Sequence, residues 1–337
     1  MSEQYALEIQ NLTKIYGSNK VLKEISFNVK KGEILGFLGL NGAGKSTTMN
    51  IITGCISPTA GSVKVCGYDV LTQPKLAKAK IGYLPENPPL YFDMTVREYL
   101  EFVYDLKRCK LPKKDHIDDI MERVKITHMA SRLIKNLSKG YKQRVGLAQA
   151  MISEPEILIL DEPTVGLDPK QIIEIRNLIR SFAQKHTVIL STHILQEVSA
   201  VCDRVAIISA GNIVAQNTIK GLEEESYDKD EFTLSIKTKD KEVEKVILSL
   251  QQIKQITAVP PRESDCLQYI VKQKKDCDCR SELGRLLNEK GYSIAELKCS
   301  APTLEEIFIH YASMNDVSSE EIEEDTPNYE NNEKKED

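Results

Sequence analysis

The 337-residue sequence has no apolar run that approaches the ~18 residues needed for a helix to cross a bilayer. Its N-terminus also lacks the pattern of a secretory signal peptide. We therefore expect any membrane role to depend on a separate partner chain. The length leaves room for about two domains, each with its own core.

Close-spaced cysteines are nearly absent. Of eight cysteines, only Cys277 and Cys279 lie close together in the sequence. Two thiols are too few for a zinc site, and scattered cysteines in a long chain favour free thiols over disulfides. We therefore expect neither a structural zinc nor a disulfide framework.

A basic surface for nucleic acid is missing as well. The net charge is −5, and the segment from Asp316 onward has ten acidic residues against two lysines, which leaves +3 for residues 1–315. This near-neutral body has no basic stripe, so we expect no nucleic acid as the main partner. The acidic segment 314–337 is expected to be disordered.

The strongest motif is a glycine-rich loop, G-L-N-G-A-G-K-S-T at 39–47, which satisfies G-x-x-x-x-G-K-[ST]. The sequence predicts a buried strand at 33–38 before it and a helix at 45–53 after it. Such a loop turns backbone N–H groups toward phosphate oxygens, and the helix dipole adds to the attraction. Lys45 supplies a charge for the terminal phosphates, and the Ser46 hydroxyl can ligate Mg²⁺. The chain is therefore predicted to bind a nucleoside triphosphate through Gly39, Asn41, Gly42, Gly44, Lys45, Ser46 and Thr47.

The remaining pattern is that of an α/β domain over 1–222. Strands are predicted at 6–12, 21–29, 62–65 and 81–84, then at 156–160 and 187–190, with a closing hairpin at 205–215. Between them, 87–154 is mostly helical, with helices at 94–107, 115–124 and 139–153. Tyr16 either packs at a strand end or stacks on a nucleotide base.

Two carboxylates follow a fully apolar strand, since 157–160 runs directly into Asp161 and Glu162. The carboxyl end of a buried strand is where α/β sheets place ligand chemistry. The next strand ends at His193, so this histidine is expected beside the carboxylates rather than in a structural role. Ser138 occupies an N-cap position and Gly140 follows it at a helix start, which favours an anion site.

Taken in order, these motifs resemble an ABC ATPase. The resemblance rests on the phosphate loop, L-S-K-G-Y at 137–141, I-L-I-L-D-E at 157–162, G-L-D at 166–168 and His193, and it covers residues 5 to about 222. It implies a P-loop NTPase of the ABC type, with a mixed sheet core, an antiparallel β subdomain and a helical insertion. It also implies ATP and Mg²⁺ as ligands, and two domains paired head to tail around each ATP.

The resemblance implies a role for each residue on the side of the phosphate loop. Tyr16 matches the aromatic that stacks on adenine, and Asp161 the residue that holds Mg²⁺ through water. Glu162 matches the general base that orients the attacking water. His193 matches the residue that hydrogen-bonds the γ-phosphate.

Other matched residues would act on the second copy. Ser138 and Gly140 would reach the γ-phosphate of the opposite ATP, and Asp168 would link the two sites. The chain departs from the family here, because Lys139 and Tyr141 replace a glycine and a glutamine of L-S-G-G-Q. A further departure is Leu40, which replaces a common proline.

Glu86 stands where a glutamine usually senses Mg²⁺ and water. A carboxylate there can still ligate the ion. The L-P-E and L-S-K-G-Y spellings resemble the exporter branch that includes gliding-motility, drug and sodium-efflux ATPases.

Residues 226–313 read as βαββαβ with a final amphipathic helix, which predicts a small ferredoxin-like accessory domain. The leading hypothesis is an ATPase subunit of an exporter, cytoplasmic and held at the inner face of the cell membrane by a separate transmembrane permease. The alternative is a soluble ABC ATPase that acts on ribosomes or DNA, although the second ATPase domain, coiled coil or zinc motif of such proteins is missing. A small-GTPase switch is excluded, because the sequence has no N-K-x-D motif.

An aromatic-rich helical segment follows Glu86. We expect its rings to form a docking surface for the permease; the alternative is that all of them pack inside the helical insertion. The five rings are Tyr91, Phe92, Tyr99, Phe102 and Tyr104.

Overall fold

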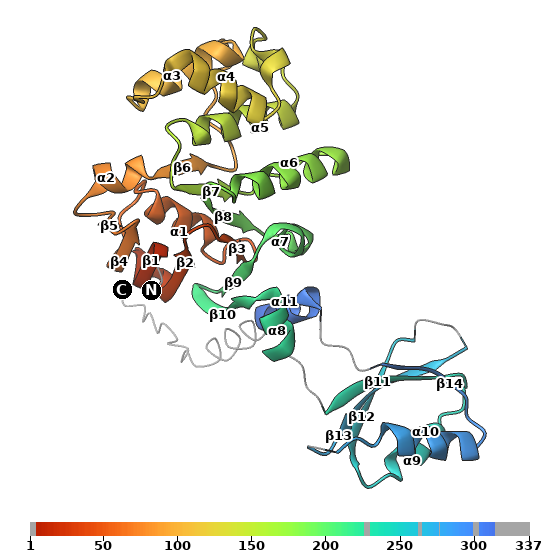
Figure 1. Cartoon of the computed structure of the whole chain (residues 1–337). Coiled ribbons are helices and arrows are strands. Elements are labelled where there is room, and N and C mark those ends of the chain that lie inside the picture. Colours follow the sequence, from red (N-terminus) through yellow and green to blue (C-terminus); the bar gives the residue numbers. More distant parts are fainter. Residues whose placement is uncertain (1–4, 226–229, 262–264, 276, 299–302, 314–337) are drawn as a thin grey trace, which may run out of the picture. The chain divides into compact units, whose positions relative to one another are not determined.

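The computed structural model describes residues 5–225, 230–261, 265–275, 277–298 and 303–313. It divides the chain into two compact units (Figure 1). The smaller unit comprises Glu223–Ile307, and the larger comprises Met1–Leu222 together with the chain from Phe308 onward. The last helix, α11 (Leu304–Ser313), thus begins in the smaller unit and ends in the larger one. The predicted disordered tail lies outside the described residues.

A four-stranded antiparallel sheet opens the larger unit, in the order β2-β1-β4-β5. The first strand was predicted to end at Leu12, but it continues to Tyr16, because residues 14–16 pair with 19–22 across a tight hairpin. Gly17 supplies the positive φ of +59° that this turn needs. The strands are β1 (Tyr5–Tyr16), β2 (Asn19–Lys30), β4 (Ala60–Val65) and β5 (Tyr68–Asp69).

The second sheet has six strands in the order β10-β9-β3-β8-β7-β6, parallel except for β10. Every residue of β3, β7 and β8 is buried, which explains why these strands read as continuous apolar runs. Because these three are neighbours and parallel, their carboxyl ends meet at one edge. The strands are β3 (Ile34–Leu38), β6 (Ile81–Leu84), β7 (Ile157–Asp161), β8 (Thr187–Thr192), β9 (Arg204–Ser209) and β10 (Asn212–Thr218).

Two hydrophobic cores hold the larger unit together. One lies between the two sheets and includes the apolar side of α1. The other joins the opposite face of the six-stranded sheet to α6 and to the insertion helices α3, α4 and α5 (Figure 1). The helices are α1 (Lys45–Ile52), α2 (Pro74–Ala79), α3 (Val96–Leu106), α4 (Lys113–Arg123), α5 (Lys139–Met151), α6 (Pro169–Phe182), α7 (Leu195–Val201) and α8 (Ile219–Glu225). Short 3-10 turns cover Thr127–Met129 and Ile134–Asn136.

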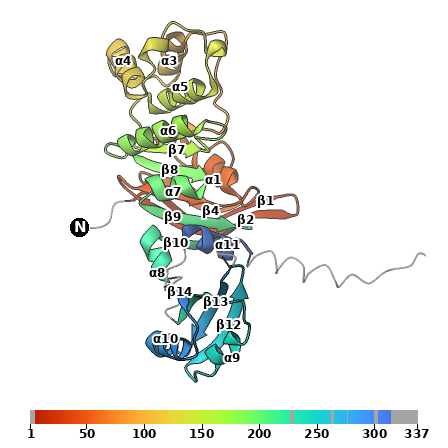
Figure 2. The same ribbon diagram turned by 90° about the vertical axis from the view of Figure 1, so that its right-hand side faces the viewer.

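The smaller unit is ferredoxin-like, as predicted. Its antiparallel sheet has the order β12-β13-β11-β14, and α9 and α10 cover one face (Figure 2). Leucines and isoleucines at alternate strand positions and at helical spacing fill the space between them. The elements are β11 (Glu231–Ile236), α9 (Val243–Leu248), β12 (Ile253–Val259), β13 (Leu267–Gln273), α10 (Arg280–Glu289) and β14 (Ile294–Lys298).

The aromatic-rich segment divides into buried and exposed rings. The prediction of a docking role is wrong for Tyr99 and Tyr104, which are 2% and 8% exposed and pack in the core. The Tyr99 hydroxyl donates to Gln149 Oε1 and lies 3.2 Å from the Pro89 carbonyl oxygen, so this ring is anchored inside. Tyr91 and Phe102 are exposed and meet edge to face, with ring centres 5.3 Å apart.

Phe92 is the third exposed ring of this segment, and the Lys142 ammonium lies 5.1 Å from its centre. In the part of the chain that the structure describes, no helix is both long and apolar enough to span a membrane.

Candidate functional site

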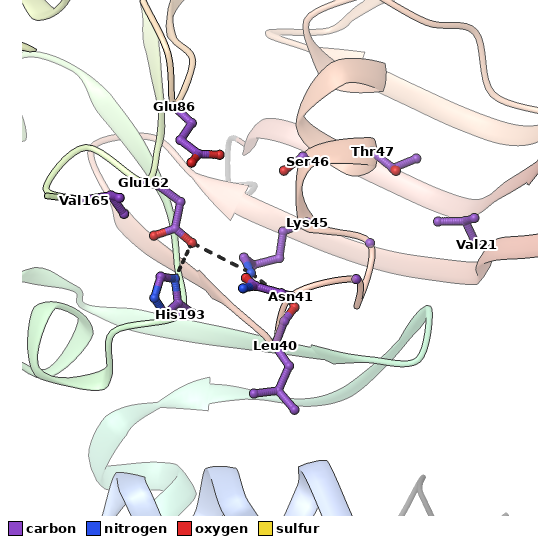
Figure 3. A pocket seen from close by; sticks show the side chains of 12 residues that line it. Val21, Leu40, Asn41, Lys45, Ser46, Thr47, Glu86, Glu162, Val165 and His193 are labelled. Atoms are coloured by element: carbon purple, nitrogen blue, oxygen red, sulfur yellow. Dashed lines mark hydrogen bonds and ion pairs between the residues drawn. The ribbon is translucent and has the colours of Figure 1, made fainter. Parts of the chain in front are cut away.

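A cavity of about 340 Å³ lies where β3, β7 and β8 end (Figure 3). The phosphate loop forms one wall, through residues 40–42 and 44–47. Glu86, Glu162 and His193 face the loop from the tips of β6, β7 and β8. Apolar contacts from Val21 and Val165 complete the lining.

Three glycines of the loop, Gly39, Gly42 and Gly44, cannot be replaced without strain, and Gly42 has φ +83°. Gly44 has φ +111°, and a Cβ there would lie 2.7 Å from the Leu22 side chain. A Cβ on Gly39 would lie 2.5 Å from the Ile208 carbonyl oxygen. Glycine at positions 39 and 44 therefore lets the loop pack closely against its neighbours on one side. The other side of the loop lines the cavity.

Lys45 points its ammonium into this loop and is 6% exposed. Its Nζ donates to the carbonyls of Gly39 at 2.8 Å and Leu40 at 3.2 Å, and lies 3.8 Å from Glu162 Oε1. Burial lowers the pKa of Lys45, while the charges of Glu162, Asp161 and Glu86 act to raise it. A single buried cation thus faces several carboxylates.

The tips of β7 and β8 are tied together. The Glu162 N–H donates to the Ser191 carbonyl at 2.9 Å, and Glu162 Oε1 lies 2.8 Å from His193 Nδ1. Glu162 adopts φ +48°, an uncommon value for a residue with a side chain. Such strain concentrates at sites where function fixes a side chain.

Asp161 is buried, and its Oδ1 has no hydrogen-bond partner among the described residues. Burial raises the pKa of Asp161, and the charges of Glu162 and Glu86 act in the same direction. The Glu86 carboxylate and the Ser46 hydroxyl point into the cavity (Figure 3), whereas Asp161 is not among the residues that line it. An unpaired oxygen among crowded carboxylates fits a divalent cation.

The described residues contain no cluster of three or more His, Cys, Asp or Glu side chains that would hold a metal by itself. A divalent cation bound in this site would need further ligands from water or from a bound phosphate.

Ser138, Gly140 and Asp168 do not line this cavity. Ser138 is exposed, and its hydroxyl makes no capping bond to α5. Gly140 packs against α6, where a Cβ would lie 2.6 Å from Gln171 Oε1. Asp168 caps α6 by accepting from the Gln171 N–H at 2.9 Å. Gly140 and Asp168 line a separate cavity of about 350 Å³.

Tyr16 also lies outside the lining of the first cavity. It ends β1 with an exposed ring, and the Lys14 ammonium is 4.8 Å from the ring centre. An exposed aromatic at this position leaves room for a flat ligand on its face.

Three buried polar residues beside Glu162 were not predicted from the sequence. Thr164, Thr192 and Glu197 form a hydrogen-bonded group behind the cavity. The two threonines sit next to motif residues, which is a usable signal. Glu197 has no such signal in the sequence, because an acidic residue on a helix is usually exposed.

Comparison with known proteins places this site in a family. Residues 22–165 match the family model described as ABC transporter. The bacitracin transport ATP-binding protein BcrA of Bacillus licheniformis is 34% identical over 305 residues, which cover 90% of this chain and 96% of that protein. The Nod factor export ATP-binding protein I of Rhizobium meliloti is 38% identical over 213 residues, or 63% of this chain and 64% of that protein.

Among solved structures, the dimeric bacterial ABC transporter cassette MJ0796 superposes with a TM-score of 0.58 at 25% identity. The match covers 63% of this chain and 98% of that one. The predicted fold of the larger unit is thereby confirmed. The chain therefore belongs to the ABC transporter family, as an ATP-binding and ATP-hydrolysing subunit.

Proposed function

We propose that this chain powers a membrane exporter, with two copies pairing head to tail around ATP beneath a separate transmembrane permease. One observation carries the proposal: the chain holds two half-sites in different places. The cavity around Lys45 has a cation, a carboxylate and a histidine, whereas the exposed start of α5 lies beside another cavity. Head-to-tail pairing would place the cavity around Lys45 of one copy against the start of α5 of the other copy.

Within the first half-site, Lys45 and the loop N–H groups neutralise the terminal phosphates. Glu162 orients the attacking water and accepts its proton, and His193 holds the γ-phosphate. Tyr16 stacks on the adenine. Positioning and charge neutralisation account for most of phosphoryl-transfer catalysis, so no covalent intermediate with the protein is needed.

Ser46, Asp161 and Glu86 would hold Mg²⁺ together with the nucleotide. The ion supplies charge neutralisation across the β- and γ-phosphates. The unpaired Oδ1 of Asp161 supports this role. Glu86 is also placed to sense the nucleotide, because it extends from the end of β6 at the start of the helical insertion.

The second half-site would act on the ATP of the other copy. Ser138 and the first N–H groups of α5 are free to receive the γ-phosphate, because the Ser138 hydroxyl caps nothing. Gly140 lets α5 approach α6 closely, and Asp168 fixes the start of α6 beside it. Asp168 is thus placed to link the two sites.

The permease would dock on the exposed rings of Tyr91, Phe92 and Phe102. Exposed aromatic rings are enriched at protein interfaces. This contact would hold the subunit at the inner face of the cell membrane. The names of BcrA and of the Nod factor export protein support a transport role. The alternative, a soluble ABC ATPase on ribosomes or DNA, would leave these rings without a function.

Mixing two inactive variants tests the head-to-tail arrangement. Lys45→Ala destroys the first half-site and Ser138→Ala the second. In a head-to-tail dimer of the two variants, one composite site has both lesions and the other has neither, so mixing should restore ATP hydrolysis. Lys45→Ala mixed with the Lys45→Ala/Ser138→Ala double variant is the control, since no pairing gives an intact site. If the first mixture is no more active than this control, the composite site is refuted.

A further inference from the structure

A buried carboxylate, Glu197, lies behind the cavity that holds the proposed base. It belongs to α7, is 1% exposed and does not line the cavity. Carboxylates are almost never buried so completely unless they are paired. Here both oxygens accept hydrogen bonds from threonine hydroxyls rather than from a cation.

One hydroxyl belongs to the loop after β7 that carries Glu162, and the other belongs to the last residue of β8, directly before His193. Thr164, two residues after Glu162, donates to Glu197 Oε1. Thr192, directly before His193, donates to Glu197 Oε2 at 3.0 Å. One carboxylate therefore fastens the tip of β7 to the tip of β8.

Thr192 also connects this carboxylate to Glu162. Its Oγ1 lies 3.4 Å from Glu162 Oε2 and accepts from the Ile194 N–H at 3.1 Å. A hydroxyl has one proton to donate, so Thr192 can serve only one of the two carboxylates at a time. Glu162 is held by His193 at one oxygen and faces this shared hydroxyl with the other.

We propose that Glu197 is a positioning residue for ATP hydrolysis, which fixes the Glu162 carboxylate and its spacing from His193 through Thr164 and Thr192. This inference rests on the proposed role of Glu162 as the base. A displacement of about 1 Å at a reacting group can lower the rate about 10²-fold. Losing the network should therefore slow the chemical step and leave ATP binding nearly intact.

Thr192→Val in the purified full chain is the sharpest test, since valine keeps the shape and removes the hydroxyl. We expect kcat to fall about 10- to 100-fold with KM for ATP changed less than about twofold. Thr192→Ser, which keeps the hydroxyl, should retain most of the activity. Glu197→Ala should lower kcat by a similar factor. If Glu197→Ala does not fold, the two Thr192 variants still test the positioning role.

Thr187→Val is the matched control. Thr187 is a buried threonine at the opposite end of β8, and its Oγ1 accepts from the Gly32 N–H at 3.0 Å. Its loss should affect stability and leave kcat unchanged. If Thr192→Val and Thr187→Val lower kcat alike, Thr192 is merely structural and the inference is overturned.

A second readout separates this inference from the proposed function. In a Glu162→Gln background, Thr192→Val should not reduce the residual hydrolysis further, because the carboxylate that it orients is gone. A further reduction by the same factor would overturn the positioning role alone. Wild-type hydrolysis by Glu162→Gln would instead overturn the role of Glu162, and this inference with it.

Discussion

Replacing Glu162 with glutamine should lower ATP hydrolysis about 10²–10⁴-fold without loss of ATP binding. The amide keeps the shape of the side chain beside His193 Nδ1, which lies 2.8 Å from Glu162 Oε1, but it cannot accept the proton of water. General-base catalysis contributes about 10²–10⁴-fold. This range corresponds to about 3–5 kcal/mol of activation free energy, at about 1.4 kcal/mol for each factor of ten.

The same change should tighten ATP binding. Lys45 Nζ lies 3.8 Å from Glu162 Oε1, and both side chains are buried. At this separation and an effective dielectric constant of about 20, the attraction is about 4 kcal/mol, and it competes with the phosphates for Lys45. Removing the carboxylate also removes a negative charge that repels the triphosphate. Affinity should therefore rise while turnover falls.

Single-turnover hydrolysis with excess protein gives the chemical rate, and equilibrium titration with a fluorescent ATP analogue gives the affinity. Glu156→Gln is the control, because Glu156 lies at the other end of the same strand and pairs with Lys80 at 2.6 Å. Its hydrolysis rate should match that of the wild type. Hydrolysis by Glu162→Gln within about threefold of wild type would refute the assignment, since a general base contributes far more.

Three further outcomes follow from the structure. Glu86→Gln should keep the ATPase activity of the isolated subunit and change its stimulation by the permease; coupling like that of the wild type would make the charge incidental. Both Gly44→Ala and Gly42→Ala add strain of about 1–3 kcal/mol at positive φ, but only the former brings a Cβ within 2.7 Å of Leu22. Scanning calorimetry should therefore show the larger loss of thermal stability for Gly44→Ala, and equal losses would contradict this. Burial raises the pKa of Glu197, so the folded chain holds this proton to higher pH than the unfolded chain, and ionisation destabilises the fold as pH rises. The melting temperature of Glu197→Gln relative to wild type should accordingly increase from about pH 5 to about pH 7.5, and a constant difference would contradict this.

Much of the fold could be predicted, because the sequence pattern of several segments agrees with the secondary structure that they adopt. A recognisable local pattern marks the apolar runs at 34–38 and 157–160, the glycine loop and the amphipathic insertion helices. The short helix α7 was missed, because seven residues are too few to establish a helical periodicity. Tyr99 lies on the apolar stripe of α3, which accounts for its burial, whereas Phe92 precedes this helix and only tertiary packing decides that its ring is exposed.

The residues of the candidate site also divide into those that the sequence predicts and those that it does not. Lys45, Glu162 and His193 each follow a strand or loop that the sequence marks, and the parallel order of the strands brings them together. The burial of Glu197 could not be predicted, because its partner Thr164 lies 33 residues away in the sequence. A contact of that range depends on the neighbouring positions of β7 and β8.

We propose that this subunit works bound to a membrane protein through the exposed rings of Tyr91, Phe92 and Phe102. A photo-crosslinking residue at Phe92, which is 51% exposed, tests it in native cells, with Leu76 of α2 as a control of similar exposure at 49%. We expect an adduct with an integral membrane protein from position 92 and none from position 76. Recovery of the chain with ribosomes or in the soluble fraction, without a membrane adduct from position 92, would contradict it.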